Sequence, residues 1–321
     1  MKYPCIMYAP TDVIDHLDMS SGYRKDFNRA TIYKMSERVF LNGRFLPGEQ
    51  ALVSANDRGF HFADGVYEVV KYYPGGPFCL EEHMERLRNS LAAVRIVYPM
   101  GVETLPVIFS RLLEENGLSG REAGVYLQIT RGSHPRVHHF PEIPEPTVYA
   151  CAFAFPSFVR QLTEGIGVIT AEDIRWLRCD IKSVSLLANT MLYQQAVERG
   201  AGECVLVRDG LVTEATHSTV MAVRHGTVVT HPLSRLILPG ITRKVVLDLC
   251  RENGIPVAEE ALPAEELHAA DELFLTGTGS EVMPVVAVDG HPVGHGLPGP
   301  VTRLLQNAFF RKVDSPLKFD R

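Results

Sequence analysis

Lys182 lies near the end of the segment EDIRWLRCDIKS, residues 172–183, between an alternating stretch and a helix-like one. Ser183 and Ser185 follow it, and either hydroxyl could cap a helix that begins near Leu186. The ammonium would then lie at the positive end of that helix, which disfavours its charged form. Because only the neutral amine attacks a carbonyl, Lys182 is a candidate for Schiff-base chemistry. Taken alone, a solvated lysine is the more common interpretation of such a position.

A carboxylate that could serve the same site is Glu214, in LVTEATHST, on the outgoing strand of a hairpin with an Asp-Gly turn. A helix over 186–199 would lead the chain about 21 Å away from Lys182, and the strand 203–208 would lead it back by about 20 Å. Lys182 and Glu214 can therefore lie close together. A carboxylate against the ring nitrogen of pyridoxal phosphate keeps that nitrogen protonated, which lets the ring accept electrons. For Glu214 alone, a surface glutamate on a strand is the alternative.

Two turns have the composition of anion-binding sites. LPGITRK places Gly240, Ile241 and Thr242 at the start of an expected helix, where free N–H groups and the helix dipole favour an anion. TGTGSE follows the strand DELFL and offers hydroxyl residues between glycines that let the backbone come close. GTGSEV does not fit a dinucleotide fingerprint, because Val282 replaces the third glycine. Arg86 could be a second phosphate clamp or a solvated helix residue.

The elements that position these residues fall into two halves. In the first half, an Asn-Gly turn and alternating apolar residues predict antiparallel strands, and apolar spacing predicts helices over 81–96 and 102–117. The second half is expected to contain helices over 185–200 and 240–254, with hairpins turning at Asp209-Gly210 and His225-Gly226. The predicted organisation is an N-terminal extension (1–36), a small α+β domain (37–155), a linker (156–164) and a large domain (165–321).

Composition excludes several classes of partner. The longest apolar run, Val148 to Phe155, is far shorter than the roughly 20 residues of a membrane span, and the first residues do not resemble a secretory signal. The charge of −6 comes without a basic block, which argues against nucleic acid or anionic lipid. Six cysteines without a CxxC pair predict reduced thiols in the cytoplasm rather than a metal or disulfide framework. A small-molecule partner is favoured.

Five stretches of this sequence, in one order, resemble the fold-type IV pyridoxal phosphate enzymes, and are most similar to the bacterial D-amino acid aminotransferases. They are DRGFHFADGVYEVVK (57–71), ITRGSHPRVHHFPE (129–142), EDIRWLRCDIKS (172–183), LPGITR (238–243) and DELFLTGTGSE (271–281). The resemblance runs from about residue 37 to the C-terminus. It implies a two-domain α+β fold, with a smaller N-terminal domain and a larger C-terminal domain that has a β-barrel-like core.

The resemblance also implies roles for individual residues. Lys182 matches the lysine that forms the internal aldimine with pyridoxal 5'-phosphate, and Glu214 matches the carboxylate on the pyridine nitrogen. The matching phosphate-binding positions are Arg86, Ile241, Thr242 and Thr278, and Leu238 matches the residue packed against the cofactor ring. Gly240 and Gly277, in the same two turns, are also expected to bind the cofactor. Tyr67, Arg136 and His138 match the trap for the substrate carboxylate, and the family's donation of the last two by a neighbouring subunit implies a homodimer.

The trap is also reasonable on chemical grounds, because an arginine fork suits bidentate carboxylate binding and tyrosine and histidine can complete the donor set. The spacing of His134, His138 and His139 could suggest a metal site, but no nearby pair of carboxylates supports it, so no metal is expected. Two residues depart from the family pattern. His217 replaces a small residue in the serine-rich stretch after Glu214, and Gly277 replaces a hydroxyl residue in the second phosphate turn.

These features predict a transaminase that moves the amino group of a D-amino acid such as D-alanine to a 2-oxo acid such as 2-oxoglutarate. An (R)-selective amine, branched-chain L-amino acid or aminodeoxychorismate activity on the same fold is the alternative, and would need the carboxylate trap elsewhere or absent. A non-catalytic protein that only binds the cofactor is a further alternative, against which the intact pair of Lys182 and Glu214 argues.

Overall fold

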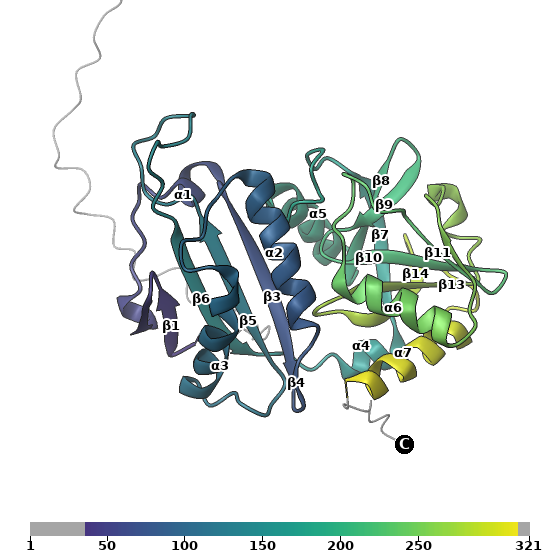
Figure 1. Cartoon of the computed structure of the whole chain (residues 1–321). Coiled ribbons are helices and arrows are strands. Elements are labelled where there is room, and N and C mark those ends of the chain that lie inside the picture. The colour runs from purple at the N-terminus through teal and green to yellow at the C-terminus, as the bar shows by residue number, and fades with distance from the viewer. Residues whose placement is uncertain (1–35, 314–321) are drawn as a thin grey trace, which may run out of the picture. The chain divides into compact units, whose positions relative to one another are not determined.

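The computed structural model of the chain describes residues 36–313, which form two β-sheets with flanking helices (Figure 1). All but the last residue of the predicted extension, 1–36, lies outside the described residues. None of the helices described is both long and apolar enough to span a bilayer. The two sheets and their helices give the mixed α+β architecture that the sequence predicts, and the fold class is confirmed.

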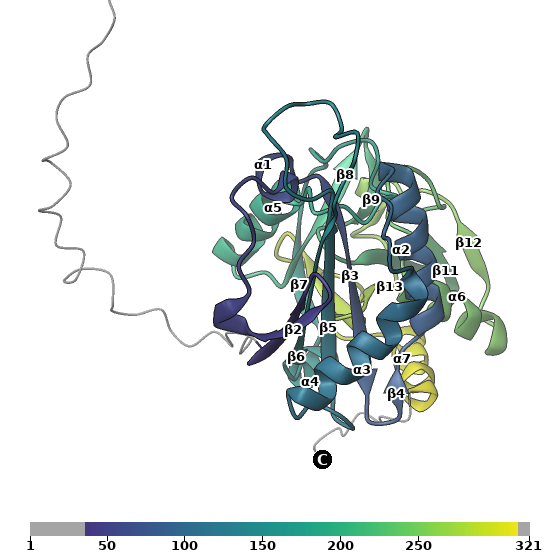
Figure 2. The same cartoon turned by 60° about the vertical axis from the view of Figure 1, so that its left-hand side comes forward.

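The first sheet has six strands, all paired antiparallel, in the order β2-β1-β6-β5-β3-β4. The strands are β1 (Arg38–Leu41), β2 (Arg44–Pro47), β3 (Gly65–Tyr73), β4 (Gly76–Pro77), β5 (Ala123–Thr130) and β6 (Thr147–Ala154). Two helices, α2 (Leu80–Val94) and α3 (Leu105–Glu115), cover one face of this sheet (Figure 2). Short helices η1 (Gly48–Gln50), α1 (Arg58–Phe62) and η2 (Val102–Thr104) occupy the connections.

The predicted helices of the first half form because their apolar spacing matches the helical repeat. Met84 and Leu87 of α2 and Phe109 of α3 are almost completely buried, in one core with Val66 and Val70 of β3. Burying one such side chain typically stabilises the fold by about 1.5–3 kcal/mol, so the two helices are fixed firmly on the sheet. Strand β3 and helix α2 thereby present the side chains that reach the second sheet.

The second sheet has nine strands in the order β12-β11-β10-β13-β14-β7-β8-β9, with β15 paired to β14. The strands are β7 (Ile166–Glu172), β8 (Glu203–Arg208), β9 (Leu211–Ala215), β10 (Thr219–Arg224), β11 (Thr227–Thr230), β12 (Val257–Glu259), β13 (Glu272–Gly277), β14 (Glu281–Val288) and β15 (His291–Pro292). Parallel pairs join β7 to β8 and β14 and join β11 to β12, so the sheet is mixed. Strand β9, at one end, contacts β10, which shows that the sheet curls into a half-barrel.

The predicted hairpin turns are confirmed by their backbone angles. Asn42 and Gly43, Asp209 and Gly210, and His225 and Gly226 all have positive φ, from 47° to 84°. Positive φ at both central residues defines the two-residue turn that matches the twist of antiparallel strands, and glycine adopts it without a steric cost. The Asp209-Gly210 turn is the one that returns β9, with Glu214, toward the segment that carries Lys182.

Three helices support the curled sheet. Helix α5 (Leu187–Glu198) packs Leu192 and Ala196 on β7 and β8, whereas α6 (Ile241–Glu252) and α7 (Pro300–Lys312) join the larger core on the other side of the sheet. Helix α6 begins where the sequence predicts, with Gly240 as its N-cap residue. Helix α7, strand β14 and the 3-10 turn η3 (Ala264–Glu266) were not predicted from the sequence.

The segment predicted as a linker, 156–164, is partly helical. It contains helix α4 (Val159–Glu164), in which Leu162 is buried. Gln306 and Arg303 of α7 donate hydrogen bonds to the Leu162 carbonyl, at 2.9 and 3.0 Å, so the segment packs on the second half of the chain. The domain boundaries themselves remain a prediction.

A buried ion pair joins the two sheets. Lys71 of β3 donates from Nζ to Oε1 of Glu281, the first residue of β14, at 2.6 Å, and the Tyr73 hydroxyl donates to the same oxygen at 2.6 Å. All three residues are nearly inaccessible to solvent. Charge-assisted hydrogen bonds between buried groups hold a geometry more strictly than apolar contacts. The first sheet is therefore fixed against the turn that precedes β14.

Candidate active site

One pocket gathers residues from both sheets. Its wall includes Tyr67 of β3, Arg86 of α2, the segment around Lys182, and Glu214 at the end of β9. Ten of the twelve residues that the sequence assigns to a site line this pocket: Tyr67, Arg86, Lys182, Glu214, Leu238, Gly240, Ile241, Thr242, Gly277 and Thr278. Arg136 and His138 do not. Residues that are far apart in the sequence thus meet in one cavity, although the role of each remains a prediction.

Lys182 is held by its backbone between two elements of the first half. Its carbonyl accepts a hydrogen bond from the Tyr67 amide at 3.0 Å, and its own amide donates to the Ser90 hydroxyl at 3.2 Å. The Nζ atom lies 4.2 Å from the centroid of the Tyr67 ring, within the range of a cation–π contact. The side chain is therefore directed into the pocket from a backbone that is fixed at both ends.

The predicted serine cap is wrong. Helix α5 begins at Leu187, its N-cap residue is Leu186, and no side chain caps it. Ser183 instead accepts a hydrogen bond from the Ser185 amide at 3.1 Å, while Val184 donates to the Gly65 carbonyl at 3.1 Å. The residues after Lys182 therefore follow β3 before the helix starts.

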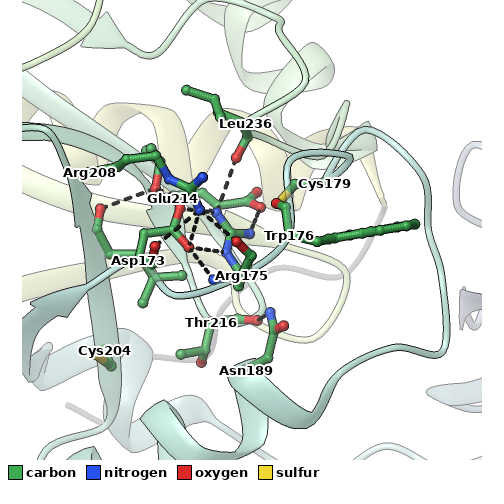
Figure 3. Close-up of polar contacts among 12 residues, drawn as sticks. Asp173, Arg175, Trp176, Cys179, Asn189, Cys204, Arg208, Glu214, Thr216 and Leu236 are labelled. Carbon is green, nitrogen blue, oxygen red and sulfur yellow. Dashed lines mark hydrogen bonds and ion pairs between the residues drawn. The ribbon is translucent and has the colours of Figure 1, made fainter. Parts of the chain in front are cut away.

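Glu214 is buried beneath the pocket in a network of charged groups (Figure 3). One of its carboxylate oxygens accepts a hydrogen bond from the Arg175 guanidinium, and the other accepts from the Leu238 amide at 3.1 Å. Burial raises the pKa of Glu214, and the Arg175 charge opposes that rise. A carboxylate in this position can share or hold a proton with a basic nitrogen in the pocket.

Arg175 is bound on its other side by Asp173. Its Nε and Nη2 atoms donate to the two Asp173 oxygens at 2.8 and 2.9 Å, and Nη2 also donates to the Leu236 carbonyl at 3.1 Å. Both residues lie inside the EDIRWLRCDIKS segment, yet neither was assigned a role from the sequence. Their spacing is the signal that could have identified them, because residues i and i+2 of an extended segment lie on the same side.

We expect Asp173→Asn to lower the free energy of unfolding at pH 7 by about 3 kcal/mol, because the buried Arg175 guanidinium loses a charged partner. Burial acts to raise the pKa of Asp173, but hydrogen bonds and charge from Arg175 outweigh it and hold that pKa at about 2. Since this value lies below that of an exposed aspartate, the stabilisation is complete at neutral pH and is lost as pH falls from about 4 toward 2. Urea unfolding of the wild type and of Asp173→Asn at pH 7, 4 and 3 should show that the difference between their free energies of unfolding becomes smaller as pH falls. A difference that stays constant would contradict the proposed ion pair as its cause.

The two anion-binding turns predicted from sequence lie on the same side of the pocket. Gly240 precedes the first turn of α6, and a Cβ atom there would lie 2.9 Å from the Thr219 hydroxyl. Gly277 ends β13, and a Cβ atom there would lie 2.6 Å from the Ser280 hydroxyl. Glycine at both positions leaves the backbone N–H groups accessible to a ligand.

A buried hydroxyl without a partner marks the same end of the pocket. The Thr276 side-chain oxygen is inaccessible to solvent and has no hydrogen-bond partner among the described residues, although Thr276 lines the cavity. Buried polar atoms are seldom left without a partner, so a polar group of a ligand is expected there. Together with the glycine turns and Glu214, the pocket fits a phosphorylated, nitrogen-containing aromatic ring such as pyridoxal phosphate.

Arg86 reaches the pocket but is already engaged. Its Nε and Nη2 atoms donate to the two oxygens of buried Glu68 at 2.8 and 2.9 Å, and Nη1 donates to the Pro239 carbonyl at 3.1 Å. Burial would raise the pKa of Glu68, but the Arg86 charge outweighs it and the pKa lies far below its usual range. The guanidinium is thus fixed beside the α6 N-terminus, and the second N–H of Nη1 is available to a phosphate.

Of the three residues predicted to bind the substrate carboxylate, only Tyr67 lines the pocket. The Arg136 guanidinium lies 5.2 Å from the centroid of the Phe62 ring, and the His138 ring lies 5.4 Å from it. Arg58 holds this loop by donating to the Val137 carbonyl at 2.6 Å. Within one chain, therefore, the loop is ordered against α1 and does not reach the Lys182 pocket. Among residues 36–313, no group of three or more potential metal ligands is present.

Comparison with known proteins gives one consistent result. Residues 65–288 match the sequence model of the family described as amino-transferase class IV. The chain is 44% identical over 271 residues to a D-alanine aminotransferase of Bacillus licheniformis, covering 84% of this chain and 95% of that protein. Among solved structures, a branched-chain amino acid aminotransferase of Escherichia coli superimposes with a TM-score of 0.81 at 28% identity, covering 89% of this chain and 98% of that one. The branched-chain aminotransferase of the archaeon Thermoproteus uzoniensis, solved with norvaline, gives a TM-score of 0.78 at 28% identity, covering 87% and 95%.

Proposed function

This chain belongs to the class IV aminotransferases, and on that premise we propose that it transfers the amino group of a D-amino acid, such as D-alanine, to a 2-oxo acid with pyridoxal 5'-phosphate as cofactor. The observation that carries the proposal is the single pocket in which an amine, a buried carboxylate and two anion-binding turns converge. The 44% identity to a D-alanine aminotransferase over most of both chains supports the substrate class. We place the protein in the cytoplasm, and the five free cysteines among the described residues suit that location.

The cofactor, when bound, supplies an aldehyde and a ring that accepts electrons from the substrate carbon. Lys182 would hold that aldehyde until the substrate amine takes its place, and the freed Nζ atom would then take the proton from the substrate Cα and later deliver it. Glu214 would keep a proton at the pyridine nitrogen, because the negative charge of its buried carboxylate favours the protonated ring. The N-terminus of α6 and the turn at Gly277 and Thr278 would bind the phosphate, together with Arg86.

The substrate carboxylate would be bound by Tyr67 of one subunit and by Arg136 and His138 of another. The loop of Arg136 does not enter the pocket of its own chain, so we propose that it completes the pocket of a second copy in a homodimer. Exposed apolar side chains on the segment 174–177 and on α5 support such an interface, since apolar surface of this kind is typical of contacts between proteins. They are Ile174, Trp176, Leu177, Leu187, Met191 and Val197. Because the Cα hydrogen must face Lys182, the position of this trap would select the D-form.

A complementation experiment tests the shared site. Lys182→Ala and Arg136→Ala proteins should each be nearly inactive alone with D-alanine, but mixed and allowed to exchange subunits they should regain activity. Each mixed dimer would contain one pocket with Lys182 from one chain and Arg136 from the other. Up to about a quarter of wild-type activity is expected from random exchange. No recovery, with exchange confirmed by native mass spectrometry, would show that Arg136 acts in its own chain or not at all.

The branched-chain L-amino acid aminotransferases are the second candidate, because solved structures of that activity share this fold at TM-scores of 0.81 and 0.78. A donor panel with 2-oxoglutarate separates the candidates: D-alanine should react well, and L-leucine and (R)-1-phenylethylamine poorly. L-leucine as the sole good donor would overturn the D-amino acid assignment. A yellow protein whose absorption band D-alanine never bleaches would indicate a cofactor-binding protein without this activity.

A further inference from the structure

His217 and Glu203 form an ion pair at the edge of the pocket. Glu203, the first residue of β8, is 1% exposed, and one of its oxygens lies 2.8 Å from Nδ1 of His217. Its other oxygen accepts hydrogen bonds from the Cys204 amide, at 2.9 Å, and from the Thr216 hydroxyl. Among residues 36–313, His217 is the one cationic side chain within ion-pair distance of this carboxylate. The other groups that contact this carboxylate are neutral donors, among them the Ser218 hydroxyl at 3.5 Å, so His217 is the residue that can bring a charge to it.

The loop that carries His217 lies against both anion-binding turns. The Ser218 hydroxyl lies 3.1 Å from the Ser280 hydroxyl, after the turn that contains Gly277. A Cβ atom on Gly277 would lie 3.5 Å from the His217 carbonyl oxygen, so the two backbones are close neighbours. Thr219 makes the corresponding close approach to Gly240 at the start of α6. His217 thus belongs to the end of the pocket where the unpartnered Thr276 hydroxyl also lies.

The groups around the His217 ring contact one of its two nitrogens and leave the other, Nε2, able to bind a ligand. Glu203 of β8 binds Nδ1, the Thr216 hydroxyl lies 3.1 Å from the same atom, and the Tyr193 ring of α5 packs edge-on at 5.1 Å. The side chain is 56% exposed. The other charged residues of the pocket wall are Arg86, Arg175, Lys182 and Glu214. With Nδ1 directed at Glu203, the remaining ring nitrogen is Nε2.

We propose that the Glu203–His217 pair is a proton-dependent part of the binding site for the cofactor phosphate, an inference that rests on the proposed function. In the protonated ring, Nδ1–H donates to Glu203, Nε2–H is a donor for a phosphate oxygen, and the positive charge offsets the buried carboxylate. In the neutral ring with Nδ1–H still on Glu203, Nε2 carries a lone pair, and the Glu203 charge opposes the phosphate. Affinity for the phosphate is therefore expected to be lower when the ring is neutral than when it is protonated.

The test uses pyridoxamine 5'-phosphate, whose amine cannot form a covalent link to Lys182, as the ligand. Trp176 is the single tryptophan of the chain and lines the pocket, so ligand binding should quench its fluorescence. Between pH 6 and 8.5, the affinity of the wild type for pyridoxamine 5'-phosphate, divided by that of His217→Gln, should fall about tenfold. This is the change expected from the loss of one hydrogen bond to a charged group. The ionisation of the phosphate itself affects both proteins equally and cancels in this ratio.

Two controls and two contrary outcomes define the experiment. Pyridoxamine without phosphate should show no such difference. His268→Gln, at an exposed histidine whose ring contacts that of His291 and does not line the pocket, should follow the wild type. An affinity ratio that does not change with pH overturns the proposal for the Glu203–His217 pair and leaves the proposed aminotransferase function intact. If pyridoxamine 5'-phosphate does not bind the wild type at all, the proposed function itself is contradicted. If His217→Gln raises the KM for D-glutamate but leaves the phosphate ligand unaffected, His217 serves the second carboxylate of a substrate, and the proposal is overturned.

Discussion

Replacing Lys182 with alanine is expected to lower kcat with D-alanine by about 10⁴-fold, because one side chain supplies both the amine that holds the cofactor and the base that moves the proton. The surrounding pocket should survive, since Lys182 is positioned by backbone hydrogen bonds from Tyr67 and to Ser90 that alanine retains. The phosphate turns would still bind the cofactor, now without a covalent bond. Single-turnover absorbance measurements, with cofactor bound at saturation, separate loss of chemistry from loss of binding.

A suitable control for that experiment is Lys312→Ala. Lys312 is half exposed at the end of α7, near Glu252, and lies outside the pocket. Its replacement should leave kcat within about twofold, because exposed ion pairs contribute little. Added methylamine should restore part of the lost rate in Lys182→Ala, since a free amine can move the proton. A Lys182→Ala protein that keeps a tenth of wild-type kcat would show that another residue performs the proton transfer.

The sequence predicts the pocket residues well where a local turn decides their position. Gly240 caps α6 and Gly277 ends β13, and in both places a Cβ atom would come too close to a neighbouring hydroxyl group. Such a need for glycine is visible in a short stretch of residues. The hairpin turns are predictable for the same reason, since positive φ favours Asn-Gly and Asp-Gly pairs. Lys182 and Glu214 could be paired only through the reach of the elements between them, and the structure brings both into one pocket.

The charged partners of Arg86 and Glu214 could not be predicted, because they depend on how the elements pack together. Glu68 holds Arg86, and Arg175 holds Glu214, because β3 packs on α2 and because the segment after β7 lies against β9. The prediction of a serine cap is wrong for a related reason. The hydrogen bond between the Val184 amide and the Gly65 carbonyl competes with helix formation, so α5 begins further along the chain. Local propensity predicts a helix near Lys182, but the contacts of β3 decide where it begins.

The Arg136 loop shows a different limit. Its residues have the chemistry to bind a carboxylate, but Arg136 and His138 do not line the pocket of their own chain. A sequence specifies each subunit and its surface without stating how copies are arranged, so a site shared between subunits cannot be built from one chain. The apolar side chains exposed on α5 and on the segment 174–177 are the feature of the structure on which the proposed dimer interface rests.

Glu214→Gln is expected to lower kcat by about 10²–10³-fold, the usual cost of removing one preorganised electrostatic group from a reacting site. The amide has nearly the same shape and can still accept the hydrogen bond of the Leu238 amide, but it carries no charge and cannot hold a proton at a ring nitrogen. Arg175 keeps its two bonds to Asp173, so the fold should persist, and thermal unfolding of the variant measures that directly. Glu259→Gln, at the exposed partner of Arg243, is the matched control and should leave kcat unchanged. If Glu214→Gln retains most of its kcat at unchanged cofactor affinity, the ring nitrogen does not need this carboxylate, and the proposed chemistry of the pocket is wrong.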